Sequence, residues 1–178
     1  MGIPKAFGKE LLVMGVLLSS GAGSPELLEL LQRNFGPLDE VSPEEAFLWT
    51  KYYEAEMGDG IRRIFLLFAD PVNPRDLAWI KTRTDELEIA FSGQKKRLVN
   101  LDPGLLAPGR FVLATTKDRA HRIALSDGIY AELTLIYQKG AFRALPWTYP
   151  DWASEPVTTM LARWRKKLPG LGKPERSS

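Results

Sequence analysis

The residues best suited to chemistry in this chain lie in one stretch, from residue 97 to residue 151. It holds the only histidine of the chain, His121, close to the cations Lys117, Arg119 and Arg122. Histidine has an unperturbed pKa that suits general acid–base catalysis near neutrality. Arginine is suited to holding phosphate or carboxylate groups through paired hydrogen bonds. These residue types together predict a site for an anionic ligand, with His121 as the hypothetical acid–base catalyst.

Acidic and hydroxyl side chains complete this candidate site. Asp102 and Glu132 are the expected catalytic partners, which would orient His121 or bind Mg²⁺, and Glu56 is a further carboxylate of this kind. The expected ligand-binding residues outside the cation cluster are Lys81, Tyr149 and Asp151. Loops at the ends of strands are where binding residues concentrate, and most of these side chains fall at such positions.

The same residues also have structural explanations. Arg122 and Glu132 face each other in the predicted hairpin register, so they could form only a cross-strand ion pair. In that register His121 falls on an apolar face with Leu133, which is typical of a structural histidine. Asp102 could serve only to stabilise a turn.

The composition limits the possible classes of protein. The chain has 178 residues, no cysteine and a formal net charge of +2, which predicts a single domain over residues 1–168 with a flexible tail at 169–178. Without cysteine, disulfides, thiolate catalysis and cysteine-bound metals are excluded, and any metal would be a hard cation such as Mg²⁺ on carboxylates. No apolar run is long enough to cross a membrane, so we expect a cytoplasmic protein. Leu11–Leu18 after Lys5 and Lys9 leaves a secretory signal peptide as an alternative.

The first half of the chain alternates strand and helix patterns. The predicted strands are Leu11–Leu18, Phe47–Glu56 and Arg62–Phe68, the last two joined by a turn at Gly58-Asp59-Gly60. The predicted helices are Pro25–Phe35 and a long helix that starts at Pro74 and ends near Phe91. The Ser- and Gly-rich loop before Ser24 lacks the ending of a P-loop, so a plain strand-to-helix connection is favoured over a phosphate loop.

The second half is predicted to be mainly strands that end in a helix. Leu98–Leu101 is a short strand, and Asp102-Pro103-Gly104 fits a type II turn. The remaining predicted elements are strand Phe111–Thr115, a hairpin of Arg119–Leu125 with Ile129–Tyr137 across Ser126-Asp127-Gly128, a pairing segment Phe142–Leu145 and helix Glu155–Lys167.

This order predicts an α+β fold. The first six elements match the ferredoxin-like split β-α-β core, to which a hairpin and a C-terminal helix are added. We expect a mainly antiparallel sheet with its helices on one face. A generic α+β sheet with another strand order is the alternative.

Short motifs spread over most of the chain resemble those of a known family. They are Tyr52–Gly58, Ile80-Lys81, Asn100–Gly104, Ala114–Asp118, His121-Arg122, Gly128–Glu132 and Trp147–Asp151. In these motifs the chain resembles bacterial proteins that are catalogued as a domain of unknown function and sometimes labelled GTP-binding. The resemblance implies no established activity. The GTP-binding label is not carried over, because the chain has neither a P-loop nor a base-reading motif.

Three functional hypotheses therefore stand after the sequence. The first is an enzyme that acts on a phosphate-containing small molecule or nucleotide. The second is a non-catalytic ligand-binding or regulatory domain. The third is an RNA-binding module that uses the basic run Arg163–Lys167, and it is the weakest, because cations are expected at a helix C-terminus for structural reasons. The sequence does not specify an oligomeric state.

Overall fold

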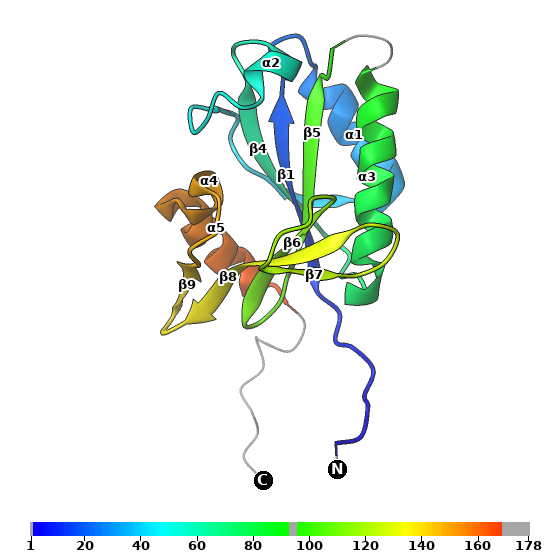
Figure 1. Cartoon of the computed structure of the whole chain (residues 1–178), viewed down its shortest axis with the longest axis vertical. Coiled ribbons are helices and arrows are strands. Elements are labelled where there is room, and N and C mark those ends of the chain that lie inside the picture. The colour runs from blue at the N-terminus through cyan, green and yellow to red at the C-terminus, as the bar shows by residue number, and fades with distance from the viewer. Residues whose placement is uncertain (1, 93–95, 169–178) are drawn as a thin grey trace.

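One antiparallel sheet of nine strands forms the centre of the computed structural model, which describes residues 2–92 and 96–168 (Figure 1). The predicted tail at 169–178 lies outside the described residues. The strands are β1 Leu11–Leu18, β2 Leu38–Val41, β3 Glu45–Ala46, β4 Arg62–Phe68, β5 Val99–Leu106, β6 Arg110–Thr115, β7 Arg122–Ala124, β8 Tyr130–Gln138 and β9 Ala141–Ala144. The helices are α1 Ser24–Phe35, α2 Glu54–Met57, α3 Leu77–Ser92, which follows a 3₁₀ turn at Pro74–Asp76, α4 Pro150–Ala153 and α5 Glu155–Arg165.

The strands lie in the order β2-β4-β1-β5-β6-β8-β7, with β3 paired to β4 and β9 paired to β8. Strand β1 is central, and every one of its residues is buried. This explains its continuous apolar sequence, because a strand covered on both faces has no polar side to present. The α+β class and the antiparallel sheet are therefore as predicted.

The two faces of the sheet are covered by different helices (Figure 1). On one face, α1 and α3 pack against alternate residues of β1 and β4, such as Met14 and Leu66. On the other face, α4 and α5 pack through Trp152, Leu161 and Trp164. The expectation of helices on one face was wrong, because the apolar stripe of α5 covers the opposite side.

The predicted strand Phe47–Glu56 is wrong. Residues 47–53 form a loop, residues 54–57 form helix α2, and the partners of β4 on this side are β2 and β3. Phe47, Tyr53 and Met57 are nevertheless anchored, since they pack with Leu17 and Ile61 in a small separate apolar cluster. The alternation of aromatic and polar residues therefore reflects a loop in which Phe47 and Tyr53 pack inward, while Trp49 and Tyr52 remain exposed.

The predicted turn at Asp102-Pro103-Gly104 is also wrong, because these residues lie inside strand β5. Asp102 pairs with Gly15, and Pro103 pairs with Met14. The pairing of β5 with β6 begins only at Gly104, which is opposite Leu113. Proline has no N–H to donate to a ladder, so Pro103 marks the point where β5 and β6 separate. Gly104 permits their close approach, because a Cβ there would lie 2.7 Å from the Val112 carbonyl oxygen.

The hairpin of β7 and β8 forms as predicted, with Arg122 opposite Glu132 and Ile123 opposite Ala131. The turn residues Asp127 and Gly128 both have positive φ, of 55° and 75°. Strand β9 pairs back onto β8, and α5 begins at Glu155 as expected. Among the helices of residues 2–92 and 96–168, none combines the length and the apolar character needed to cross a bilayer.

Candidate functional site

A cleft of about 630 Å³, here called the polar cleft, opens on the sheet face that carries α4 and α5. Its lining comes mainly from the loop at 47–53, from α3, from the strands β4 to β8, from the turn after β6, and from residues 149–152. Eight of the nine predicted site residues line this cleft: Lys81, Asp102, Lys117, Arg119, Arg122, Glu132, Tyr149 and Asp151. His121 is not among the lining residues.

Arg63 on β4 is a buried cation that lines the cleft. Its side chain is only 6% exposed, and its Nη2 lies 2.8 Å from Asp151 Oδ2 while its Nη1 lies 3.4 Å from Asp102 Oδ2. The guanidinium carbon also lies 4.6 Å from the centre of the Phe65 ring and 5.1 Å from that of Trp152. One cation thus joins two carboxylates, from β5 and α4, within an aromatic setting.

Gly15 on β1 makes room for this arrangement. A Cβ at this position would lie 2.6 Å from Trp152 Cζ2 and 2.7 Å from Arg63 Nη2. The single glycine inside the apolar run Leu11–Leu18 therefore serves close packing, which is the usual meaning of a glycine inside a strand.

Side chains from α3 occupy the edge of β5 where β6 has diverged. Lys81 Nζ donates to the Leu101 carbonyl oxygen at 3.0 Å, and Glu88 Oε1 accepts from the Leu101 N–H at 2.6 Å. These side chains replace the missing strand, since unpaired backbone groups at a buried edge are costly. Lys81 also forms an ion pair with Asp85 at 2.7 Å. These two contacts give Lys81 a structural role that does not require a ligand.

Glu132 on β8 is almost fully buried, at 1% exposure, and contacts both Arg122 and His121. Its Oε2 accepts from Arg122 Nε at 2.7 Å and lies 3.0 Å from His121 Nε2. The His121 ring stacks on Trp147 with ring centres 4.8 Å apart. The hydrogen bond to Glu132 and the stacking on Trp147 both fit a hydrogen-bonded structural histidine, although a buried carboxylate also faces its nitrogen. His121 thus contacts the cleft-lining residue Glu132 without lining the cleft itself.

Arg122 connects Glu132 to the mouth of the cleft. Its Nη2 donates to the Tyr149 hydroxyl at 3.1 Å, and its Nη1 donates to the Lys117 carbonyl oxygen at 2.7 Å. Burial opposes the charge on Arg122, but its bonds to Glu132 and Tyr149 outweigh that effect and raise its pKa. The guanidinium is therefore a fixed positive group whose donors are largely occupied within the chain.

Two other cations of the cleft remain available. Lys117 and Arg119 are exposed, and neither forms an ion pair with any described carboxylate. Lys117 Nζ lies 5.0 Å from the centre of the Tyr52 ring. Trp49, Tyr52 and Tyr149 are each about half exposed nearby, so the mouth combines free positive charge with aromatic surfaces.

The carboxylates of the cleft do not form a metal site. In the described residues, no group of three or more His, Asp or Glu side chains is placed to hold a metal ion. Asp102 and Asp151 approach the same point, but the Arg63 guanidinium occupies it. Burial raises the pKa of Asp151, and the nearby Asp102 carboxylate adds to this while Arg63 opposes it.

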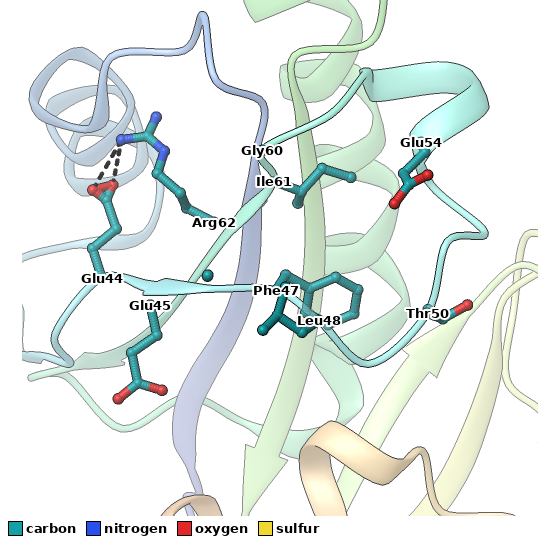
Figure 2. Close-up of a pocket in the computed structure, with 10 residues that line it drawn as sticks. Glu44, Glu45, Phe47, Leu48, Thr50, Glu54, Gly60, Ile61 and Arg62 are labelled. Carbon is teal, nitrogen blue, oxygen red and sulfur yellow. Dashed lines mark hydrogen bonds and ion pairs between the residues drawn. The ribbon is translucent and has the colours of Figure 1, made fainter.

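A second, smaller hollow of about 340 Å³ lies on the other side of the loop at 47–50 (Figure 2). Three glutamates, Glu44, Glu45 and Glu54, are among its lining residues. Arg62 Nη1 donates to both oxygens of Glu44, at 2.7 and 3.0 Å, and its Nη2 donates to backbone carbonyls of Ser19 and Ala22. The cation of this hollow is thus already engaged, unlike those at the mouth of the polar cleft.

Sequence reasoning missed Arg63, Arg97 and Asn100 as cleft residues. Arg97 donates to Glu88 Oε2 at 2.5 Å and to Asn100 Oδ1 at 2.6 Å, and so positions the Asn100 amide. The available signal for Arg63 was its position next to the apolar run Ile64–Phe68, as the second of two arginines that begin this strand. A cation in such a run has to find buried partners.

The basic run at the end of α5 is engaged within the chain. Arg163 and Lys167 form ion pairs with Glu40, at 2.6 and 2.5 Å, and Lys167 also pairs with Asp39. Arg165 lies over the Tyr137 ring at 3.7 Å. These contacts give most of this basic run a role in holding α5 against β2 and β8.

The chain was compared with known proteins at the level of sequence family and of structure. Comparison with curated proteins and with solved structures gave no match. One family model matches residues 9–168, which covers every described helix and strand. The chain therefore belongs to the family described as Domain of unknown function (DUF4416).

Proposed function

We propose that the polar cleft binds a small anionic molecule, and that its anionic group is a phosphate. The observation that carries this proposal is the pair Lys117 and Arg119, two exposed cations at the cleft mouth without a carboxylate partner among the described residues. The other cations of the cleft, Arg63, Lys81, Arg97 and Arg122, all have carboxylate partners.

Phosphate suits this arrangement for a physical reason. It carries more negative charge than a carboxylate and offers several acceptor oxygens, so two exposed cations can bind it at once. The cleft volume of about 630 Å³ falls in the range typical of small-molecule sites. A phosphate metabolite or a nucleotide is therefore the ligand class we propose, in preference to RNA.

Catalysis is a second candidate function, favoured by one contact. Glu132 is buried, is bonded to His121, and has one carboxylate oxygen, Oε1, without a partner among the described residues. In an enzyme, Glu132 would be the proton acceptor that faces the ligand and His121 would be its positioning partner, rather than the reverse. Asp102 is held by Arg63 and would serve to position that cation.

We also propose that the first half of the fold is a ferredoxin-like split β-α-β unit. Four strands support this proposal through their order β2-β4-β1-β5, their antiparallel pairing, and the packing of α1 and α3 on one face. The remaining strands and α4 and α5 would then be an addition that supplies half of the cleft wall.

The function is tested by a thermal-shift screen of nucleotides and phosphate metabolites, each with and without Mg²⁺. A ligand that binds the native state raises the melting temperature in a concentration-dependent way. The double variant Lys117→Ala with Arg119→Ala should lose the response. The matched control, Lys5→Ala with Lys9→Ala, removes the same charge from exposed positions outside the cleft and should keep it. An equal response in both double variants would contradict the proposal.

A further inference from the structure

Four buried polar atoms of cleft-lining side chains have no hydrogen-bond partner among the described residues. They are Glu132 Oε1, Asn100 Nδ2, Arg63 Nε and Arg63 Nη2, and the last of these has only its ion-pair contact with Asp151. Glu132 is 1% exposed, Asn100 5% and Arg63 5%. Buried polar groups are nearly always paired, so unpaired ones around a cleft indicate where a ligand supplies the partners.

Glu132 requires a hydrogen-bond donor from the ligand. Its Oε2 is occupied by Arg122 Nε and His121 Nε2, and these two contacts fix the orientation of the carboxylate. The remaining oxygen, Oε1, can only accept while the group is ionised. A hydroxyl or an amine on the ligand would satisfy it, whereas a phosphate oxygen would be repelled.

Asn100 requires a hydrogen-bond acceptor. Its Oδ1 accepts from Arg97 Nη2 at 2.6 Å, which distinguishes the two ends of the amide, because an N–H end could not accept that bond. The Nδ2 group is therefore the one left without a partner. Arg63 Nε and Nη2 are two further donors without a hydrogen-bond acceptor.

Hydroxyl groups satisfy both requirements, because each can donate to a carboxylate and accept from an amide. The half-exposed rings of Trp49, Tyr52 and Tyr149 add apolar surfaces of the kind that a sugar ring can cover with its C–H face. On the basis of the proposed phosphate site, we propose that the ligand is a sugar phosphate. Its phosphate would lie at Lys117 and Arg119, and its hydroxyls would bond to Glu132 and Asn100.

A nucleotide shares this chemistry, since it also carries a hydroxylated ring and a phosphate. The two ligands differ in that a nucleotide also carries a base, for which the cleft would need room and hydrogen-bonding partners. A base would need its own hydrogen-bonding groups, whereas ring hydroxyls alone match the unpartnered atoms of Glu132 and Asn100. The proposed ligand is therefore a sugar phosphate that carries no base.

Calorimetric titration of the full chain tests this with defined probes: inorganic phosphate, pentose and hexose phosphates, the same sugars without phosphate, deoxy sugar phosphates, and nucleoside monophosphates. We expect one sugar phosphate to bind at least about tenfold more tightly than inorganic phosphate and than its free sugar. Removing the hydroxyl that bonds to Glu132 or Asn100 should weaken it at least about fivefold. This ligand-side test requires no altered protein.

The variant Glu132→Gln tests the same contact from the protein side. It keeps the shape but places an N–H where an acceptor is needed, so the preference for the sugar phosphate over inorganic phosphate should fall at least about tenfold. Glu45→Gln, an exposed position outside the polar cleft, should keep that preference. If Glu132→Gln does not fold, Asn100→Ser, which removes the amide donor, replaces it.

Each outcome decides between the proposals. If inorganic phosphate and all phosphate esters bind with the same affinity, the proposed phosphate site stands, but the proposal that the ligand is a sugar phosphate is wrong. If nucleoside monophosphates bind more tightly than every sugar phosphate, the phosphate site again stands, but the proposal of a sugar phosphate as the ligand is wrong. If no phosphate compound binds, both proposals fail.

Discussion

Arg63 Nη2 lies 2.8 Å from Asp151 Oδ2, and this contact ties strand β4 to helix α4 beside the polar cleft. The two residues are 88 positions apart in the sequence, and both side chains are at most 10% exposed. Asp102 on β5 completes the cluster at 3.4 Å from Nη1. The two halves of the cleft wall are therefore joined by one buried cation.

Replacing Arg63 should strongly destabilise the fold. Arg63→Gln leaves Asp102 and Asp151 close together without their shared cation, and removing one member of a buried ion pair typically costs about 3–5 kcal/mol. Chemical denaturation measures the free energy of unfolding. Arg75→Gln, at a position with a 74% exposed side chain, is the control and should change it by less than about 0.5 kcal/mol. Similar small effects in both variants would show that the cluster contributes little to stability.

Asp151 should give the stability of the protein a defined pH dependence. Burial raises its pKa in the folded state, with Asp102 adding to the shift and Arg63 opposing it. The folded protein thus holds this proton more tightly than the unfolded chain, whose value is near 3.8. The stability that protonated Asp151 contributes is therefore fully present below the pKa of the unfolded chain. It is lost as the pH rises through the higher pKa of Asp151 in the folded protein.

Asp151→Asn removes this titration, so the variant should gain stability relative to the unaltered protein as the pH rises from about 3.5 to about 7. Denaturation curves across that range measure the difference, whatever constant offset the substitution adds. Asp59→Asn, at an exposed turn, is the matched control and should show no such trend. A relative gain by the unaltered protein with rising pH would contradict the assigned direction.

Gly104 should tolerate no side chain, because β5 and β6 approach closely there. A Cβ would lie 2.6 Å from Phe111 Cζ and 2.7 Å from the Val112 carbonyl oxygen, and the backbone atom cannot move aside. Gly104→Ala should cost about 1–3 kcal/mol in free energy of unfolding, as overpacking typically does. Gly109→Ala meets no atom within 4 Å and is the control. Equal stability of the two variants would contradict the close approach of β5 and β6 at Gly104.

Local sequence patterns correctly predicted the elements that are set by short-range features, such as a fully buried strand or a tight hairpin turn. Leu11–Leu18 is buried at every position and was recognised by its continuous apolar run. The pairing of Arg122 with Glu132 followed from the three-residue turn, because loop length and a left-handed glycine set the register. That pairing brought two cleft residues together correctly.

Long-range pairing produced the main errors. Asp102-Pro103-Gly104 has a strong turn signal, but its pairing with β1 over eight residues outweighs that local preference. The site residue Arg63 could not be found locally either, because its partners Asp102 and Asp151 come from distant segments. His121 was singled out by its residue type, but its ring stacks on Trp147 and it does not line the cleft, which its residue type could not indicate.

The most direct test of the account is calorimetric titration of the best phosphate ester from the screen into the unaltered protein and into the Lys117→Ala, Arg119→Ala double variant. Charge-assisted hydrogen bonds are each worth about 1.5–3 kcal/mol, so losing both cations should weaken binding by at least about tenfold. The denaturation midpoint should stay nearly unchanged, since both side chains are exposed. Unchanged affinity in the double variant would contradict the assignment of the cleft mouth as a phosphate site.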